Sequence, residues 1–164
     1  MVRLMVYEIR SLPPTANEIE ICSRWLNAEW GAAMGYTVED TVEWCRGVAS
    51  DADESMLCLF DAAKPVGVAM LVENDLAERP ALGPWLSSLY VLPEYRGLGL
   101  GRRLASAAIE RVRRMRRGNL YLYVQRGKLE GYYASLGFRT AEALRLRDKS
   151  FLIMQMPIEQ LNRD

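Results

Sequence analysis

The sequence predicts a single α/β (α+β) domain over residues 1–164. Short runs in which apolar residues alternate, typical of strands, take turns with longer segments in which they recur every three or four residues, typical of helices. One of the strand-like runs leads through a glycine-rich loop directly into a long helical pattern. A chain of 164 residues is long enough for one buried core, and it contains no repeat, linker or low-complexity segment.

The first fifty residues predict one strand and two helices. Residues 2–10 alternate as a strand does, and Pro13 and Pro14 end it. Residues 15–30 form a helix whose apolar positions are Ile19, Cys22, Leu26 and Trp30. Residues 37–40 (Thr-Val-Glu-Asp) have the pattern of a capping box with Asp in place of Glu. They open a second helix that reaches about residue 49.

The middle of the chain predicts three strands. Residues 56–60 and 66–72 are apolar runs, and residues 61–65 between them have the composition of a hairpin turn. Residues 73–84 form a longer loop that contains two prolines. Residues 86–92 are the strand that enters the glycine-rich loop.

The last third of the chain again alternates helices and strands. Residues 102–117 form a helix that Gly118 is expected to end. A strand at 120–124 is followed by a short helix at 129–136. Two further strands are predicted, at residues 138–146 and 150–156.

The glycine-rich loop, residues 96–102, reads Arg-Gly-Leu-Gly-Leu-Gly-Arg. Glycines at alternate positions permit positive φ angles and leave backbone N–H groups uncovered. A helix that begins at the same point adds its own unpaired N–H groups and the positive end of its dipole. Arg96, Arg102 and Arg103 add cationic donors. The loop is therefore expected to hold phosphate, although its spacing matches neither the dinucleotide fingerprint nor the Walker loop.

Two motifs in this region resemble those of one family. Residues 96–101 fit the pyrophosphate-binding loop Q/R-x-x-G-x-G/A of the GNAT acetyltransferases at every fixed position. Residues 133–138 (Tyr-Ala-Ser-Leu-Gly-Phe) fit the ending Y-x-x-x-G-F that the same family places after its phosphate-binding helix and the next strand. The similarity covers residues 85 to 140. The lead-in at residues 84–86 (Pro-Trp-Leu) resembles a bacterial, small-molecule-like branch of the family.

The resemblance implies a mixed, mostly antiparallel sheet flanked by helices, and an N-acetyltransferase that uses acetyl-CoA as co-substrate. An amine acceptor would attack the thioester directly in a ternary complex. The strand before the loop is implied to bond the pantetheine arm through its backbone, with the Val91 N–H as donor to the thioester oxygen. The residues implied to bind the cofactor are Leu89, Tyr90, Val91, Arg96, Gly97, Leu98, Gly99, Leu100, Gly101 and Arg102.

Two further positions follow from the same resemblance. Tyr133 matches the family's general acid, which protonates the leaving thiolate, and a phenol pKa of about 10 is close enough to a thiol pKa of about 8.5 for this role. Tyr132 is adjacent, but only Tyr133 has the five-residue offset to Phe138. Arg126 stands where many members have a cofactor-contacting Asn, and we expect it to reach a phosphate instead.

The general base stays open at this point. An alkyl amine with a pKa near 10.4 is mostly protonated at neutral pH, so a group must take its proton. Residues 85–92 hold no carboxylate. Glu73 and Asp75 follow the preceding strand and are candidates, with solvated loop carboxylates as the alternative interpretation. A water relayed by Ser87 or Ser88 is the other possibility.

Aromatic residues suggest where the acceptor binds. Trp85 precedes the cofactor strand, and Trp30 and Tyr36 fall in the region that forms the family's usual acceptor wall. All three are candidate acceptor contacts, because aromatic faces attract cations. Core or groove packing is the alternative for tryptophans in amphipathic helices.

Composition excludes several chemistries. The chain has no histidine, which excludes Ser-His-Asp and Cys-His mechanisms and His-containing zinc sites. Cys22, Cys45 and Cys58 lack the spacing of metal ligands, so we expect small buried thiols and no metal. Residues 1–90 carry 6 Lys/Arg and 14 Asp/Glu, whereas residues 91–164 carry 15 and 7, so the two segments have net charges of −8 and +8. The basic segment suits an anionic cofactor and the acidic segment a cationic amine.

The expected partners are acetyl-CoA and an amine, first of a small molecule and second of a protein N-terminus or lysine. A non-catalytic acyl-CoA-binding or sensing module is the alternative function. The arginines of residues 111–117 suit a helix C-terminus without nucleic acid, which we do not expect as a partner. The N-terminus lacks signal-peptide features, and no apolar run approaches the roughly 20 residues of a membrane span. A cytoplasmic protein without a membrane partner is expected, and a homodimer is common in the family.

Overall fold

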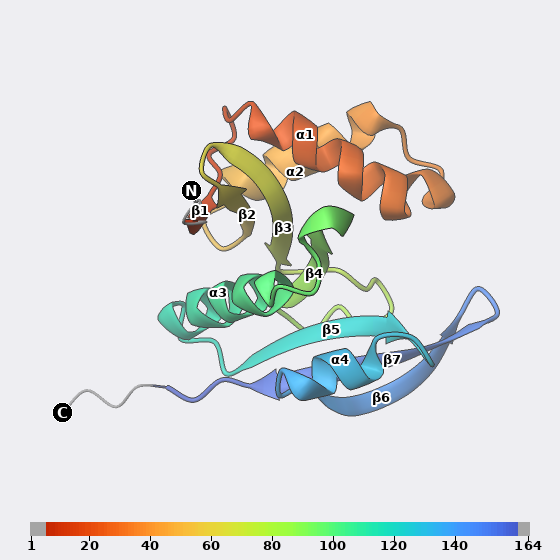
Figure 1. Ribbon diagram of the computed structural model, residues 1–164. Helices are drawn as coiled ribbons and strands as arrows, with labels where there is room; N and C mark the ends of the chain where they lie inside the picture. The colour runs from red at the N-terminus through yellow and green to blue at the C-terminus, as the bar shows by residue number, and fades with distance from the viewer. Residues whose placement is uncertain (1–5, 161–164) are drawn as a thin grey trace.

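The computed structural model describes residues 6–160, which form one seven-stranded sheet with helices on both faces (Figure 1). The strand order is β1-β2-β3-β4-β5-β7-β6, and every neighbouring pair is antiparallel except β4 and β5. The strands are β1 (Tyr7–Ser11), β2 (Ser55–Asp61), β3 (Lys64–Val72), β4 (Trp85–Val91), β5 (Asn119–Gln125), β6 (Arg139–Leu146) and β7 (Lys149–Pro157). The predicted α/β class and mixed, mostly antiparallel sheet are thus confirmed.

The helices divide between the two faces of the sheet. They are α1 (Glu18–Leu26), α2 (Val38–Ser50), α3 (Leu100–Arg114) and α4 (Glu130–Ser135). Figure 1 shows α1 and α2 on one face and α3 and α4 on the other. Each face has its own apolar core: Ile19, Cys22 and Cys45 pack under α1 and α2, whereas Leu104, Val112 and Phe138 pack under α3 and α4.

Most predicted elements are present, with small shifts of their ends. The sequence predicts the first strand from residue 2; residues 1–5 lie outside the described part, and the observed strand begins at Tyr7. The capping box is confirmed: Thr37 Oγ1 accepts from the Asp40 N–H at 3.1 Å, and Asp40 Oδ2 accepts from the Thr37 N–H at 2.8 Å. The three cysteines are buried thiols, as predicted.

The first helix is shorter than the predicted residues 15–30. After α1, one π-helical turn (Asn27–Gly31) and one 3-10 turn (Ala32–Met34) lead to α2. Asn27 explains the change, because its buried amide donates to the carbonyls of Tyr36 and Thr37, each at 2.9 Å, and to Thr41 Oγ1 at 3.0 Å. Side-chain bonds of this kind compete with regular helix.

The α3 helix also ends earlier than predicted. Its last helical residue is Arg114, and the chain reverses at Arg116, whose φ is 57°. Gly118 is therefore not the residue that ends the helix. None of the helices between residues 6 and 160 is long and apolar enough to cross a membrane.

Candidate functional site

A gap opens between the two parallel strands of the sheet. In register, β4 meets β5 at Trp85 and Tyr121, and the Tyr121 N–H donates to the Pro84 carbonyl at 3.0 Å. Beyond this pair no further register is shared by the two strands, both of which lie wholly in the described part of the chain, although each keeps its antiparallel neighbour. The two strands therefore pair only at the start of β4, and the rest of β4 has no paired neighbour on the β5 side.

Backbone groups of β4 face this gap. The Leu92 N–H donates to the Val66 carbonyl of β3 at 2.9 Å, so residues 90 and 92 direct their backbone groups toward β3. Successive residues of a strand alternate, so the groups of Leu89 and Val91 point to the β5 side. An extended ligand can pair with such an uncovered edge as an added strand would.

The β4 strand contains a bulge at Ser87. Met70 of β3 pairs with Ser88 and Leu71 pairs with Leu86, which leaves Ser87 as the extra residue. The bulge changes which residues share a face. The Ser87 hydroxyl lies within 2.8 Å of Asp75 Oδ1 and donates to it from the bulge.

The loop after β4 has the geometry of an anion cradle. Gly97 and Gly99 adopt φ of 77° and 74°, which the missing side chain makes inexpensive. Within the described residues, no hydrogen bond takes up the N–H groups of Gly97 and Gly99, and α3 begins immediately afterwards at Leu100. Gly101 is needed for a different reason: a Cβ there would lie 2.6 Å from the Tyr132 hydroxyl. The loop therefore presents free N–H donors and the positive end of a helix dipole.

The arginines around the loop differ in the contacts that their side chains make. Arg96 Nε donates to the Val91 carbonyl at 2.8 Å, and its guanidinium lies 5.4 Å from the centre of the Tyr90 ring. Arg102 makes only long contacts to Ser135, at 3.3 and 3.4 Å. Arg126 is exposed and lines a hollow of about 250 Å³ with Arg145 of β6. Arg96 and Arg102 are placed at the cradle, whereas Arg126 lies beside the β6–β7 hairpin.

Tyr133 lies under the sheet on the α3/α4 side. It sits on α4, and its ring packs against Phe138 at 6.0 Å and Tyr132 at 5.2 Å. Burial, and next the neighbouring Tyr132, raise the pKa of Tyr133 to about 12. The phenol therefore keeps its proton throughout the neutral range, and its pKa lies further above that of a thiol than the ordinary phenol value of about 10 does.

A second polar group lies on the opposite side, below α1 and α2. Burial raises the pKa of the half-buried Asp75 carboxyl, and the hydrogen bond from Ser87 opposes the rise. Burial, followed by the charges of Asp75 and Glu78, raises the pKa of Tyr123 to about 12. Tyr123 lies on β5, and Ser87, which donates to Asp75, lies on the neighbouring β4.

Two sequence-based candidates are not placed to act as predicted. Both carboxylate oxygens of Glu73 accept from the guanidinium of Arg117 at 2.9 Å, so this carboxylate is held in an ion pair that occupies both of its oxygens. Trp85 is 0 % exposed, and its indole N–H donates to the Leu82 carbonyl at 2.8 Å. Trp85 is therefore core rather than acceptor contact: it supports Tyr121 and Tyr123 at ring distances of 5.6 and 6.0 Å.

The other two acceptor candidates lie at the connection between α1 and α2. Trp30 is 41 % exposed and meets the Tyr90 ring edge-on at 6.4 Å. Trp25 stacks on the same ring at 5.9 Å, a contact the sequence did not single out. Tyr36 is exposed near Trp30 in sequence, and no ring contact ties it to the strand in the described part of the chain.

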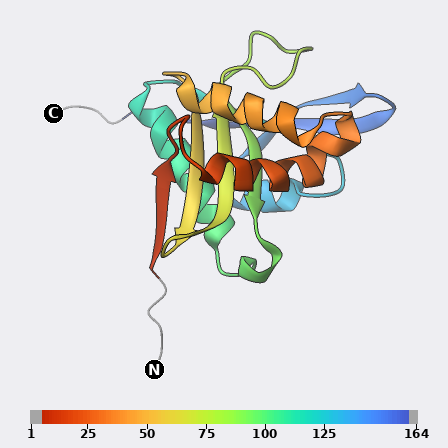
Figure 2. The same cartoon turned by 90° about the horizontal axis from the view of Figure 1, so that it is seen from above.

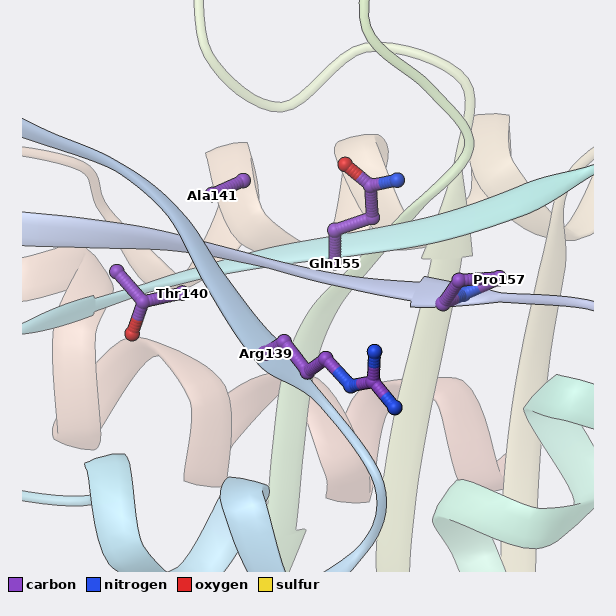
Figure 3. A pocket seen from close by; sticks show the side chains of 5 residues that line it. All are labelled: Arg139, Thr140, Ala141, Gln155 and Pro157. Carbon is purple, nitrogen blue, oxygen red and sulfur yellow. The ribbon is translucent and has the colours of Figure 1, made fainter.

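A shallow hollow of about 230 Å³ lies away from these groups. Figure 3 shows its five lining residues on β6 and β7: Arg139, Thr140, Ala141, Gln155 and Pro157. They include no carboxylate, thiol or phenol. The hollow therefore offers none of the groups needed for proton transfer or nucleophilic attack.

Comparisons with known proteins agree with this geometry. A family model described as the acetyltransferase (GNAT) family matches residues 13–138. The structure of yncA from Salmonella typhimurium with its cofactor acetyl-CoA is similar with a TM-score of 0.71 at 16% identity, covering 96% of both chains. The ribosomal-protein-S18-alanine N-acetyltransferase from Escherichia coli gives 0.69 at 20% identity, covering 97% of this chain and 98% of that one. Aminoglycoside 6'-acetyltransferase type Ii gives 0.75 at 18% identity, covering 94% and 99%.

Proposed function

The chain belongs to the acetyltransferase (GNAT) family, and from this premise we propose that it transfers the acetyl group of acetyl-CoA to the primary amine of a small molecule. The amine attacks the thioester directly while both substrates are bound. Acetyl-CoA supplies the activated acyl group, and the residues of the chain bind, orient and move protons.

One observation carries this proposal. Tyr133 belongs to the core under α3 and α4, whereas Ser87 of β4 donates to Asp75, whose charge acts on Tyr123 in the core under α1 and α2. Acetyl transfer to an amine needs a proton removed from the nucleophile and a proton given to the leaving thiolate. A donor and an acceptor on opposite faces of the sheet meet this need without competing for the same proton.

The glycine-rich loop holds the pyrophosphate in this account. The free N–H groups of Gly97 and Gly99 and the first turn of α3 are the donors, with Arg96 and Arg102 at the rim. Leu89 and Val91 bond the pantetheine arm through the backbone groups that face the gap. Arg96 donates to the Val91 carbonyl, and the Val91 N–H on the β5 side is the proposed donor to the thioester oxygen.

Asp75 is the general base in the proposal, acting directly or through Ser87. Its raised pKa brings it closer to neutrality, where a carboxylate is a more effective proton acceptor. Glu73 is not proposed, because Arg117 occupies both of its carboxylate oxygens. Tyr133 is the general acid in the proposal: it is protonated at neutral pH and donates a hydrogen bond to the departing thiolate.

A thiol assay tests the proposal. Release of free CoA is followed with a thiol reagent while a panel of small primary amines is offered with acetyl-CoA. The three cysteines are buried, so they should add little background. Amine-dependent release of CoA, with the acetylated amine identified by mass spectrometry, is the expected result. Tight binding of acetyl-CoA without release for any amine would instead favour a sensing module.

A further inference from the structure

The turn between α1 and α2 has a structure that cofactor binding does not require. The π-helical turn Asn27–Gly31 interrupts the helix, and such turns are frequent at functional sites. Asn27 is only 7 % exposed and donates three hydrogen bonds, to Tyr36, Thr37 and Thr41. Gly31 is part of the same arrangement, since a Cβ there would lie 2.8 Å from the Asn27 amide nitrogen.

The consequence of this turn is the position of Trp30. Its ring meets Tyr90 of β4 edge-on at 6.4 Å, and Trp25 stacks on the other part of the same ring at 5.9 Å. Tyr90 lies between Leu89 and Val91, whose backbone groups face the gap. The turn therefore places a half-exposed indole beside the strand on which transfer is proposed to occur.

A second group of rings follows β5 and β7. Tyr123 contacts Trp85 at 6.0 Å and Phe151 at 5.8 Å, and it lies in the core on the α1/α2 face together with Tyr90. The α1–α2 connection and the β6–β7 hairpin lie at the same side of the molecule in both views (Figure 2). The acceptor side of the gap thus has aromatic rings on both flanks.

Several carboxylates near these flanks are held in ion pairs. Two of the nearby carboxylates are neutralised, Glu73 by Arg117 and Glu142 of β6 by Arg79. Asp75, which the proposed mechanism uses, and the exposed Glu78 are the carboxylates whose charges act on Tyr123. Asp75, bonded to Ser87 of β4, suits one amine, and the rings of Trp30 and Tyr123 suit an apolar body attached to it.

We propose that the acceptor is a monoamine carried on a flat apolar body, of the arylalkylamine class, with Trp30 as the specificity-determining residue and Asn27 as the residue that positions it. This inference rests on the proposed acetyltransferase function. The amine enters beside Ser87 and Asp75, and its ring packs against Trp30 on the Tyr90 side and faces Tyr123 across the gap. Ring-to-ring packing adds favourable free energy beyond that of burying the apolar area.

Steady-state kinetics with β-phenylethylamine and n-butylamine test this directly. The two probes share one primary amine and differ in the ring. The wild-type protein is expected to use β-phenylethylamine with a kcat/KM at least about tenfold higher, since a hydrophobic pocket discriminates apolar groups by this order. Trp30→Ala should lower kcat/KM for β-phenylethylamine about tenfold, mainly through KM. It should leave kcat/KM for n-butylamine and the KM for acetyl-CoA unchanged. Trp30→Phe should restore most of the loss.

The chain offers a matched control. Trp44 on α2 is also 41 % exposed and has no ring contact with a strand residue in the described part of the chain. Trp44→Ala should leave both amines unaffected. Asn27→Ala should reproduce the KM effect of Trp30→Ala with acetyl-CoA binding retained. If Asn27→Ala does not fold, the Trp30 pair of variants still decides the inference.

Two kinds of result separate this inference from the function on which it rests. If spermidine or a lysine-containing peptide is preferred over β-phenylethylamine, or if Trp30→Ala and Trp44→Ala behave alike, the acceptor class is wrong and the acetyltransferase stands. If acetyl-CoA does not bind in a calorimetric titration and no amine releases CoA, the proposed function fails and the inference fails with it.

Discussion

In the proposed mechanism single residues carry the proton transfers, and Asp75 is the one whose role pH would reveal. Its folded-state pKa is raised above the ordinary value of 3.8, chiefly by burial. The groups that act with it on this side are the Ser87 hydroxyl, the Tyr123 phenol and the Glu78 carboxylate. The base is active only when ionised, so activity should rise with pH through a pKa higher than that of an exposed aspartate.

Asp75→Asn tests this role. We expect kcat/KM for the amine to fall by about 10²-fold or more and the acidic limb of its pH profile to disappear. The fold should not suffer: a raised carboxyl pKa means that ionisation destabilises the folded state as pH rises from 3.8 through the folded value. The variant should therefore melt at the same or a higher temperature at pH 7, measured by circular dichroism. A lower melting temperature together with unchanged activity would contradict both statements.

Tyr133→Phe tests the proton donor. The substitution keeps the ring and its contact with Phe138, so the fold should remain intact. We expect kcat to fall by about 10²-fold while the affinity for acetyl-CoA, measured by calorimetry, stays within a few-fold of wild type. Tyr132→Phe is the matched control on the same helix and should retain kcat. Equal loss in the two variants would show that helix packing rather than the Tyr133 proton matters.

Secondary-structure elements set the stability of the acceptor side. Thr37 caps α2 and accepts from the Asp40 N–H, so Thr37→Ala should lower the free energy of unfolding by about 1 kcal/mol.

Gly47 lies inside α2, and a Cβ added there would meet nothing within 4 Å. Gly47→Ala should therefore raise the free energy of unfolding by about 0.5–1 kcal/mol. Urea unfolding measures both. A change of the same sign in both variants would contradict the assignment of cap and helix interior.

Local patterns predicted most elements and the cofactor loop, because these depend on neighbours in sequence. The alternating runs, the capping box and the positive-φ glycines of the loop were visible in this way. The turn at Asn27 was not, since an Asn within an apolar helical pattern does not reveal bonds to residues 9 to 14 positions away. The ion pair of Glu73 with Arg117, 44 residues apart, is equally invisible locally.

The candidate site was predicted only where a motif spans it. Tyr133 and the loop each belong to a continuous motif. In chain order the loop precedes α3, and Tyr133 follows β5. Asp75 and Ser87 were separate candidates, and only tertiary structure joins them by a hydrogen bond. Trp85 was misjudged because its aromatic character gave no information on burial, which pairing with Tyr121 on a neighbouring strand decides.

At the scale of the whole molecule, the acidic and basic halves of the sequence correspond to the proposed acceptor-binding and cofactor-binding parts. Residues 1–90, with net charge −8, supply α1, α2 and the strands up to β4, and residues 91–164, with net charge +8, supply the phosphate-binding loop and α3. The ion pairs Lys64–Glu94, Arg79–Glu142 and Glu73–Arg117 join the two segments across the sheet. An anionic cofactor would thus meet the basic segment, and a cationic acceptor would meet the acidic one.

The most direct test of the account is a calorimetric titration of acetyl-CoA into the wild-type protein, Gly99→Glu and Gly47→Glu. Gly99 has a φ of 74°, so a glutamate there is strained and brings a negative charge to the cradle. Gly47→Glu adds the same charge on an exposed helix position. We predict binding to wild type and Gly47→Glu and no detectable binding to Gly99→Glu. No binding to the wild-type protein, or equal binding to all three, would contradict the central claim that this loop holds the pyrophosphate of acetyl-CoA.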